Sequence, residues 1–526
     1  MAVTQEKGNI DEHIAGLREK HCGGNAGPAD ARQKAYLAKL LLAQGKTPEA
    51  LPYLAEAWDE ARKLWAASSD NKFLWTGFLC DIGAVLASTL DYGNDVAAAE
   101  QIYRDLLDLQ PNGPFIGDYA IFLHRKKKDY TQAEAFYLRA LELYPGQSSM
   151  HMKYATFLRH VKKDLKKADV QYRLAIEANK KNPEAIGSYA SFLHGAVGKI
   201  DMAGELYEEA LRQDTFHANN LCNFGLYLSE ERGDYVRAET LYKRALEHTP
   251  RHANTLYNYA VMLDTHCRRK AEAESLYLRV VDDVEPRHAF ALYNLAVLLE
   301  DKVAQMDKNE DGARRALGQG DAPLDEAVAE ARRQRRLEVC GLYRRAVACD
   351  EKDAVTAADL GRYLLTRIED IDGAEAALFN ALQIDSENVV ARYNLALLMH
   401  KHRGDLHAAE KLLLSLCASS SHKHVAAMQQ LGRLHLDKFK LTADQRDLDA
   451  SLRSYEKTTD LLAGKDPALC MIEYLRVVMQ HGSNRQKTRA VVFIEGALAN
   501  KSIGRASDIA AMITSIKRLQ EPAAKA

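Results

Sequence analysis

A spacing of 35 residues recurs through the middle of this 526-residue chain and constrains its fold more than any other feature. Four columns of residues keep this register. An alanine column consists of Ala133, Ala168, Ala203, Ala238 and Ala273, and a tyrosine column follows it at Tyr137, Tyr172, Tyr207, Tyr242 and Tyr277. A third column contains Ala140, Ala175, Ala210, Ala245 and Val280, and a fourth contains Ala120, Ala155, Ala190, Gly225 and Ala260. A fixed period of this length is typical of repeat architectures.

Each period contains two stretches in which apolar residues have helical spacing. Leu256, Tyr259, Ala260 and Leu263 form one such stripe, at intervals of three and four residues. A short polar segment such as KKKD or ERGD separates the two stretches, and proline often follows the second, as at Pro145. Each period therefore predicts an antiparallel pair of helices, helix A and helix B. Because one pair cannot bury its apolar stripe alone, we expect successive pairs to stack.

These features resemble the tetratricopeptide repeat (TPR) family. Helix A resembles the family pattern in its Leu or Tyr followed by Ala or Gly, and helix B in its Ala-x3-Tyr-x2-Ala run. The family period is about 34 residues, and we expect the extra residue to fall in the turn between the two helices. The resemblance implies an all-α fold, a right-handed α-solenoid of about eleven helix-turn-helix repeats with a C-terminal helical cap. Half-a-TPR repeats of RNA-processing factors are a weaker match, since helix A lacks their early tryptophan.

A break in the third column locates an insertion. After Val280 the next members are Ala346, Ala381 and Leu416, so one repeat carries 31 additional residues. We expect a mobile segment at 1–30, repeats over 31–465 with the insertion at about 303–333, capping helices at 466–520 and a tail at 521–526. The inserted residues are expected to form a solvated, flexible loop in the turn of their repeat.

The inserted sequence DKNEDGARRALG begins at Asp307 and resembles the start of a calcium-binding loop. An EF-hand loop needs a glutamate at position twelve, but that position is Gly318, and Arg314 and Arg315 occupy positions eight and nine. We therefore expect no calcium site. Glutamates and a helical stripe run through the following segment, so we expect its arginines to lie on an exposed helix face. They are Arg332, Arg333, Arg335 and Arg336.

Composition and motifs point away from catalysis and metal binding. The formal net charge is -2, so no global field attracts nucleic acid or anionic lipid. The eight cysteines contain no C-x-x-C pair, which predicts buried reduced thiols. The histidines of MHKHRGDLH and SHKH should lie at opposite ends of one helix, roughly 18 Å apart, too far to share an ion. We find no catalytic motif, and expect no enzyme activity, no cofactor and no metal.

The sequence also lacks the expected signals for secretion or membrane insertion. The N-terminus MAVTQEKGNIDEH has no basic start followed by an apolar core, and no uninterrupted apolar run appears long enough to span a bilayer. We expect a cytoplasmic protein. Proteins of the TPR family often occur in ciliary and cytoskeletal assemblies, so the resemblance adds these locations to the expectation.

Asparagine recurs on the side of helix A that should face the groove of a stacked array. The residues are Asn223, Asn258, Asn294 and Asn394, with Tyr257, Tyr293 and Tyr393 beside them. They resemble an asparagine column with which some family members hold an extended peptide. An amide can pair with both the N–H and the C=O of a peptide. Other repeats break the column with Asp118, Lys153, Ser188 and Asp359. The alternative role is hydrogen bonding within or between repeats.

A basic edge is predicted by two turns that occupy equivalent positions, HRKKKD at 124–129 and RHVKKDLKK at 159–167. Stacking should bring their lysines together. They include Lys126, Lys127, Lys128, Lys162 and Lys163. Such an edge would attract acidic protein surfaces such as tubulin tails, whereas isolated solvated turns are the alternative.

Together these observations predict a non-enzymatic scaffold or adaptor for protein-protein interaction. Partner polypeptides would lie in the concave groove and on the basic edge, within a large assembly such as a ciliary or cytoskeletal one. The alternatives are an RNA-processing repeat protein and a regulatory or substrate-selecting subunit of an enzyme complex. We expect neither nucleic acid nor a membrane as the partner, and the oligomeric state stays open.

Overall fold

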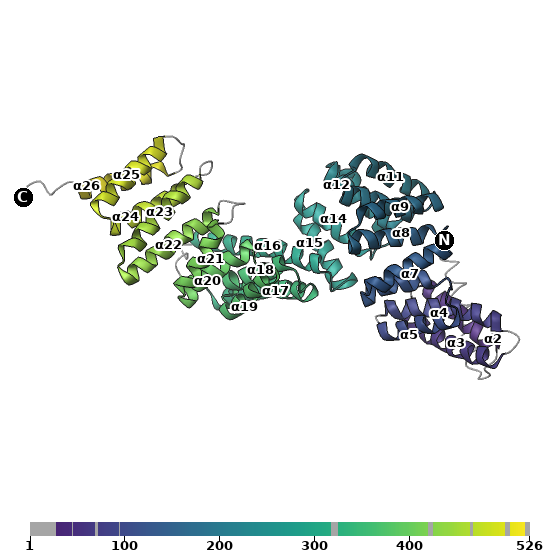
Figure 1. The fold of residues 1–526 in the computed structure, drawn as a ribbon. Coiled ribbons are helices and arrows are strands. Elements are labelled where there is room, and N and C mark those ends of the chain that lie inside the picture. Colours follow the sequence, from purple (N-terminus) through teal and green to yellow (C-terminus); the bar gives the residue numbers. More distant parts are fainter. Residues whose placement is uncertain are drawn as a thin grey trace, which may run out of the picture. The chain divides into compact units, whose positions relative to one another are not determined.

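The computed structural model describes residues 28–44, 46–68, 72–93, 95–316, 324–418, 424–462, 467–499 and 505–520. Over these ranges the chain forms helices joined by short turns, with no strand, which confirms the predicted all-α class (Figure 1). The chain divides into two compact bodies, Met1–Asn258 and Tyr259–Ala526. The predicted N-terminal segment up to residue 27 and the tail at 521–526 lie outside the described residues.

The first body consists of consecutive helix pairs. They are α2 (Pro28–Ala43) with α3 (Thr47–Ala67), α4 (Lys72–Tyr92) with α5 (Val96–Leu109), α6 (Ile116–Phe122) with α7 (Tyr130–Leu143), α8 (Ser148–Phe157) with α9 (Leu165–Ala178), α10 (Pro183–Phe192) with α11 (Ile200–Gln213), and α12 (Ala218–Glu231) with α13 (Tyr235–His248). The A helices also contact one another, since α10 packs on both α8 and α12. This confirms stacking of the pairs. Helix α14 (Ala253–Thr265) contains the boundary between the bodies.

The second body continues the pattern. Its helices are α15 (Lys270–Leu278), α16 (Ala289–Ala316), α17 (Glu326–Cys349), α18 (Ala354–Tyr363), α19 (Ile371–Ile384), α20 (Val389–Leu398), α21 (Leu406–Ala418), α22 (Val425–Thr442), α23 (Gln445–Leu461), α24 (Ala468–His481), α25 (Asn484–Ala499) and α26 (Ala506–Gln520). Helices α16 to α23 pack as consecutive pairs, and α24 contacts both α25 and α26.

The alanine and tyrosine columns form the core of the pairs. Tyr172 is 1 % exposed, and its ring centroid lies 5.9 Å from that of Tyr189 and 5.1 Å from that of Phe192, both on the following A helix. The neighbouring columns must stay small to admit these rings. At Gly225 an added Cβ would lie 2.8 Å from the ring of Tyr242, closer than packed atoms approach. The repeating small residues therefore allow close contact between successive helices.

The A helices of several repeats end in a wide, π-helical turn. These turns are η1 (Leu123–Lys127), η2 (Leu158–Lys162), η3 (Leu193–Val197), η5 (Leu364–Ile368) and η6 (Met399–Arg403). A π turn holds one more residue than an α turn. A left-handed residue follows each one, at Lys128, Lys163, Gly198, Glu369 and Gly404. In these repeats the wide turn adds one residue where the A helix ends. Helix α12 keeps the same 35-residue spacing without a π turn, so the placement of the extra residue stays a prediction.

Replacing glycine with alanine should have opposite effects on stability at a left-handed position and inside a helix. Gly404 has φ of 70°, and we expect Gly404→Ala to lower the free energy of unfolding by about 1 kcal/mol, because a Cβ disfavours this conformation. Gly341 lies inside α17 with open space around it, so Gly341→Ala should raise stability by up to about 1 kcal/mol. Chemical denaturation of both variants tests the assignment. Equal effects of the two substitutions would contradict it.

Helix α4 bears on one expectation about the sequence. Its segment Lys72–Asp91 is long and apolar enough to cross a membrane by length and composition, with a mean hydropathy of 1.6. Asp81 interrupts this segment, so it is not the uninterrupted apolar run that the sequence was expected to lack. Helix α4 packs against α3 and α5 like the other A helices of the first body. A core helix of a helical stack passes the same test.

Candidate functional site

An uncharged polar surface lies on the A helices α12 and α14 of the first body. We call it the amide face, and it consists of Asn219, Asn223, Asn254, Tyr257 and Asn258. Residues four apart on a helix share one side, so each helix contributes two asparagines at this spacing. Asn219 and Asn254 are exposed, whereas Asn223, Tyr257 and Asn258 are half-buried.

The hydrogen bonds of the amide face leave Asn223 and the exposed Asn254 without a partner among the described residues. The Nδ2 atom of Asn258 donates to Sγ of Cys222 over 3.4 Å, a contact that joins α14 to α12. Oδ1 of Asn219 pairs with Nε2 of His252 at 2.9 Å. The side chain of Asn223 makes no hydrogen bond to any described residue. Its donor and acceptor therefore remain available at a half-buried position on α12.

The predicted asparagine column takes a different role in the second body. Asn394 is 6 % exposed, and its Nδ2 donates to the carbonyl of Val390 in the same helix over 2.8 Å. A surface role for Asn394 was therefore wrong, and it fits the alternative of hydrogen bonding within a repeat. Asn294, Tyr293 and Tyr393 are half-buried on A helices of this body.

A network of charges occupies the A-helix side of the second body around Tyr293. The Tyr293 hydroxyl donates to Asp359 over 2.8 Å, and Nε of Arg362 also donates to Asp359, over 3.1 Å. The two terminal nitrogens of Arg362 each donate to Glu300 over 2.8 Å. Burial opposes ionisation of Glu300, but the hydrogen bonds and charge of Arg362 outweigh it and lower the pKa of its carboxyl. These side chains satisfy one another.

The predicted basic edge is partly neutralised within the chain. Lys126 lies 3.3 Å from the Asp91 carboxylate, and Lys127 lies 2.7 Å from Glu100. Lys162 lies 2.8 Å from Glu134. Lys128 and Lys163 are exposed in the left-handed positions after η1 and η2. Ion pairs thus hold three of the five lysines that sequence reasoning assigned to partners.

One of these contacts belongs to a repeating ion pair that sequence reasoning missed. Its acid follows the alanine column on helix B, and its base lies 28 residues later, on the next A helix or in the wide turn that ends it. The members are Glu134 with Lys162, Glu274 with Lys302, Glu375 with Arg403, and Glu410 with Lys438. The signal was present as an acid and a base at constant spacing. Each pair joins one repeat to the next.

The inserted segment is helical over its described part, which corrects the prediction of a loop. Helix α16 continues to Ala316, and α17 already begins at Glu326. We call residues 302–316 and 326–336 the arm. Residues 317–323 lie outside the described chain. The acidic sequence beginning at Asp307 is therefore one side of a helical hairpin rather than a metal-binding loop.

Six charged side chains pack between the two helices of the arm. Arg332 is 7 % exposed, and it donates to Glu310 and to Asp311 over 2.8 Å each. Arg336 donates to Asp307 over 2.6 Å, and Arg335 donates to Glu310 over 2.9 Å. The prediction of an exposed helix face holds for Arg333, but it was wrong for Arg332. These arginines hold the two helices of the arm together by pairing with the acidic side chains of the opposite helix.

Histidines and cysteines show no metal-binding geometry in the described part of the chain, where no group of three or more His, Cys, Asp or Glu side chains could hold an ion. His400 instead bonds through its two ring nitrogens to Gln430 at 2.9 Å and to Asp437 at 3.2 Å. The described cysteines are free thiols, and several of them are buried. Ser421, His422 and Lys423 of the second histidine group lie outside the described residues.

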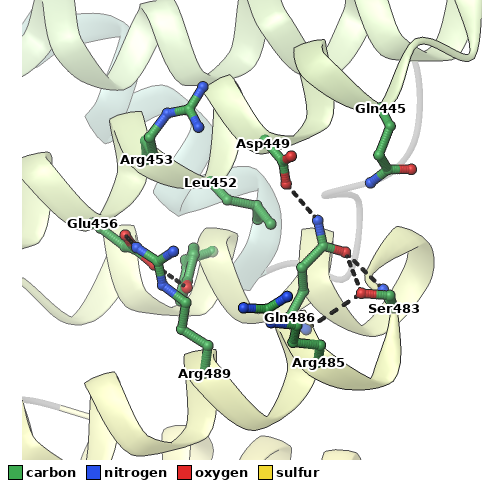
Figure 2. Close-up of a pocket in the computed structure, with 10 residues that line it drawn as sticks. Gln445, Asp449, Leu452, Arg453, Glu456, Ser483, Arg485, Gln486 and Arg489 are labelled. Atoms are coloured by element: carbon green, nitrogen blue, oxygen red, sulfur yellow. Dashed lines mark hydrogen bonds and ion pairs between the residues drawn. The ribbon is translucent and has the colours of Figure 1, made fainter.

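A polar cavity of about 430 Å³ lies between α23 and α25 in the second body (Figure 2). Asp449, Arg453 and Glu456 line it from α23, and Arg485, Gln486 and Arg489 line it from α25. A reciprocal capping box begins α25, because the Gln486 N–H donates to Ser483 Oγ while the Ser483 N–H donates to Gln486 Oε1. The cap fixes the start of α25 beside the cavity.

Solved structures give partial matches at low sequence identity. The human IFIT1 dimer with m7Gppp-AAAA aligns with a TM-score of 0.46 and 14 % identity, over 77 % of this chain and 90 % of that chain. PilF of Pseudomonas aeruginosa aligns with a TM-score of 0.35 and 17 % identity, over 45 % and 91 %. PilW, a widely conserved type IV pilus biogenesis factor, gives 0.33 and 21 %, over 42 % and 98 %. No family model and no curated protein matches the chain.

Proposed function

We propose that this protein is a non-enzymatic scaffold that binds an extended segment of a partner polypeptide along the amide face of the first body. The observation that carries this proposal is the Asn223 side chain, which is half-buried and makes no hydrogen bond to a described residue. The amide atoms of Asn223 keep contact with solvent, so a partner can reach both its donor and its acceptor. A bound peptide backbone would supply both an N–H and a C=O to it.

The spacing of the helices supports an extended ligand. Packed helices lie about 8–10 Å apart, and an extended chain rises roughly 3.3 Å per residue. About three residues of an extended peptide therefore bridge the distance from an amide on α12 to the equivalent amide on α14. Tyr257 adds apolar surface with a polar tip beside Asn258, which suits a side chain of the same peptide.

Other parts of the predicted site contribute less to this proposal. The charged network around Arg362 is satisfied internally, and Asn394 is buried. On the basic edge, Lys128 and Lys163 are the exposed lysines of the five for which the structure records no ion pair to a described residue. An acidic partner surface on this edge, and a cytoplasmic or cytoskeletal assembly that contains it, are secondary parts of the proposal.

Photo-crosslinking from the amide face tests the scaffold role. We replace Tyr257 with p-benzoylphenylalanine and expose the protein to light in an extract of its native source. The matched control carries the same crosslinker at Val236, which is 79 % exposed on α13. We expect polypeptides that crosslink from position 257 and not from position 236. Equal capture from both positions, or capture of RNA that ribonuclease removes, would contradict the proposal.

A second measurement identifies the side chains that bind the captured partner. A synthetic peptide of the crosslinked segment is titrated calorimetrically into wild type and into Asn223→Ala/Asn258→Ala. Loss of two hydrogen-bonding amides, at about 0.5–1.5 kcal/mol each, predicts roughly 5- to 150-fold weaker binding. Asn394→Ala is the matched control, because it removes a buried amide of the second body, and affinity should stay unchanged. Equal affinities of all three proteins would remove the amide face from the binding site.

A further inference from the structure

The cavity between α23 and α25 has an excess of positive charge at its walls (Figure 2). Both of its carboxylates are already engaged. Asp449 accepts from Nε2 of Gln486 over 2.7 Å. Glu456 accepts from the Tyr474 hydroxyl over 2.8 Å and from Arg489 over 2.6 Å.

Two arginines of the same cavity form no ion pair within the described part of the chain. Arg453 on α23 and Arg485 on α25 are exposed, and neither forms an ion pair with a described residue. A guanidinium presents several N–H groups in a fixed plane, which suits the paired oxygens of a carboxylate or a phosphate. The cavity therefore offers donors that the protein itself does not use.

The start of α25 carries charges of the wrong sign for helix stability. Acidic residues stabilise the positive end of a helix dipole, and basic residues near it are unfavourable, most strongly in the first turn. The first turns of α25 contain Arg485, Lys487 and Arg489 and no acidic residue. The capping box shows that this terminus is otherwise well formed. A departure from a local rule in a well-formed element is typical of a functional site, and a bound anion would offset the repulsion.

From these observations we infer that the cavity binds an oxyanion carried by a partner polypeptide, through Arg453 and Arg485. The oxyanion is a carboxylate of an acidic segment or the phosphate of a phosphorylated residue. Only the polypeptide carrier rests on the proposed scaffold function. The anion site itself rests on the cavity, its spare arginines and the charge at the start of α25, and it lies in the other body from the amide face.

Fluorescence anisotropy with three labelled peptides tests this inference on the full-length chain. The probes are a ten-residue glutamate peptide, a glycine-serine peptide of equal length with two phosphoserines, and a ten-residue glutamine peptide. We expect binding of one or both anionic peptides and none of the glutamine peptide, with affinity that falls as salt rises. The stronger of the two anionic probes identifies the source of the oxyanion. Equal binding of the neutral peptide would overturn the inference.

Paired variants separate the cavity from general electrostatic attraction. Arg453→Gln/Arg485→Gln should weaken the anionic peptide at least about tenfold. Arg476→Gln on α24 is the matched control, because Arg476 is also exposed and lies outside the cavity lining, and it should leave affinity unchanged. Equal weakening by the control, absence of anionic peptide binding, or tighter binding of a single-stranded RNA of equal length would overturn the site. Asn223→Ala/Asn258→Ala should have no effect here, so failure of this site and failure of the amide face are distinguishable.

Discussion

Replacing Arg332 with methionine is expected to unfold the arm and to lower the free energy of unfolding of the second body by about 1–3 kcal/mol. Arg332 is buried and donates to both Glu310 and Asp311, while Asp307 lies beside it. Its removal leaves carboxylates between two helices without enough positive charge. Hydrogen exchange over residues 302–316, together with chemical denaturation, measures the effect.

Arg333→Met is the matched control for this prediction. Its side chain is 73 % exposed and lies 3.9 Å from Glu330, so the variant should change stability by less than about 0.5 kcal/mol. Undiminished exchange protection of residues 302–316 in Arg332→Met would show that the charges do not hold the arm together.

Acid gives an independent measure of the same cluster. The hydrogen bond from Arg332 lowers the pKa of the Asp311 carboxyl in the folded protein. A carboxyl with a depressed native pKa stabilises the fold above its unfolded pKa of about 3.9, and this contribution is lost as pH falls through the native value. Protection of the arm should therefore persist at neutral pH and fall below roughly pH 4. Loss of protection between pH 5 and pH 7 would instead implicate another group.

The second large effect is expected at the tyrosine column of the first body. Tyr207 is 1 % exposed, and its ring centroid lies 5.6 Å from that of Phe224 and 5.7 Å from that of Tyr227. Tyr207→Ala should lower the free energy of unfolding by about 3–5 kcal/mol, the range for large buried aromatic residues. The cavity opens between α11 and α12, so hydrogen exchange should accelerate first in these two helices.

Tyr207→Phe separates the loss of the ring from the loss of its hydroxyl. This variant keeps the packing against Phe224 and Tyr227, and we expect it to cost no more than about 1.5 kcal/mol. A full-sized loss in Tyr207→Phe, or a small loss in Tyr207→Ala, would show that packing between successive pairs is not the main source of stability.

The repeat pairs were predictable because their information is periodic. Alanine and tyrosine at a constant spacing predict both where a helix lies and which of its sides packs against the next helix. The structure shows why the small residues are needed, since Gly225 leaves no room for a Cβ beside its neighbouring ring. The wide turns were predictable only as an extra residue. Their π-helical form depends on backbone hydrogen bonds that residue types at these positions do not specify, since lysine, glutamate and glycine all follow such turns.

The arm and the candidate site were less predictable, for two physical reasons. Asp307 and Arg336 meet across a hairpin, and a composition rich in Asp, Asn and Gly favours a loop unless its charges find partners. The helical register predicts on which side of its helix Asn394 lies. It does not predict how deeply Asn394 is buried, because burial depends on how closely neighbouring helices approach. The spare arginines at 453 and 485 are recognisable only after every other nearby charge has been paired.

The arm also has a consequence for how such an array can change over time. Its three acidic side chains pair with three arginines within the hairpin, so the charges of the arm are largely balanced by one another. The arm still contacts its repeats at its base, where Lys302 pairs with Glu274 and the Arg336 carbonyl accepts from the Tyr363 hydroxyl. Beyond this base, a change in one charge of the hairpin calls for a matching change on the opposite helix of the arm, not in the repeats that flank it.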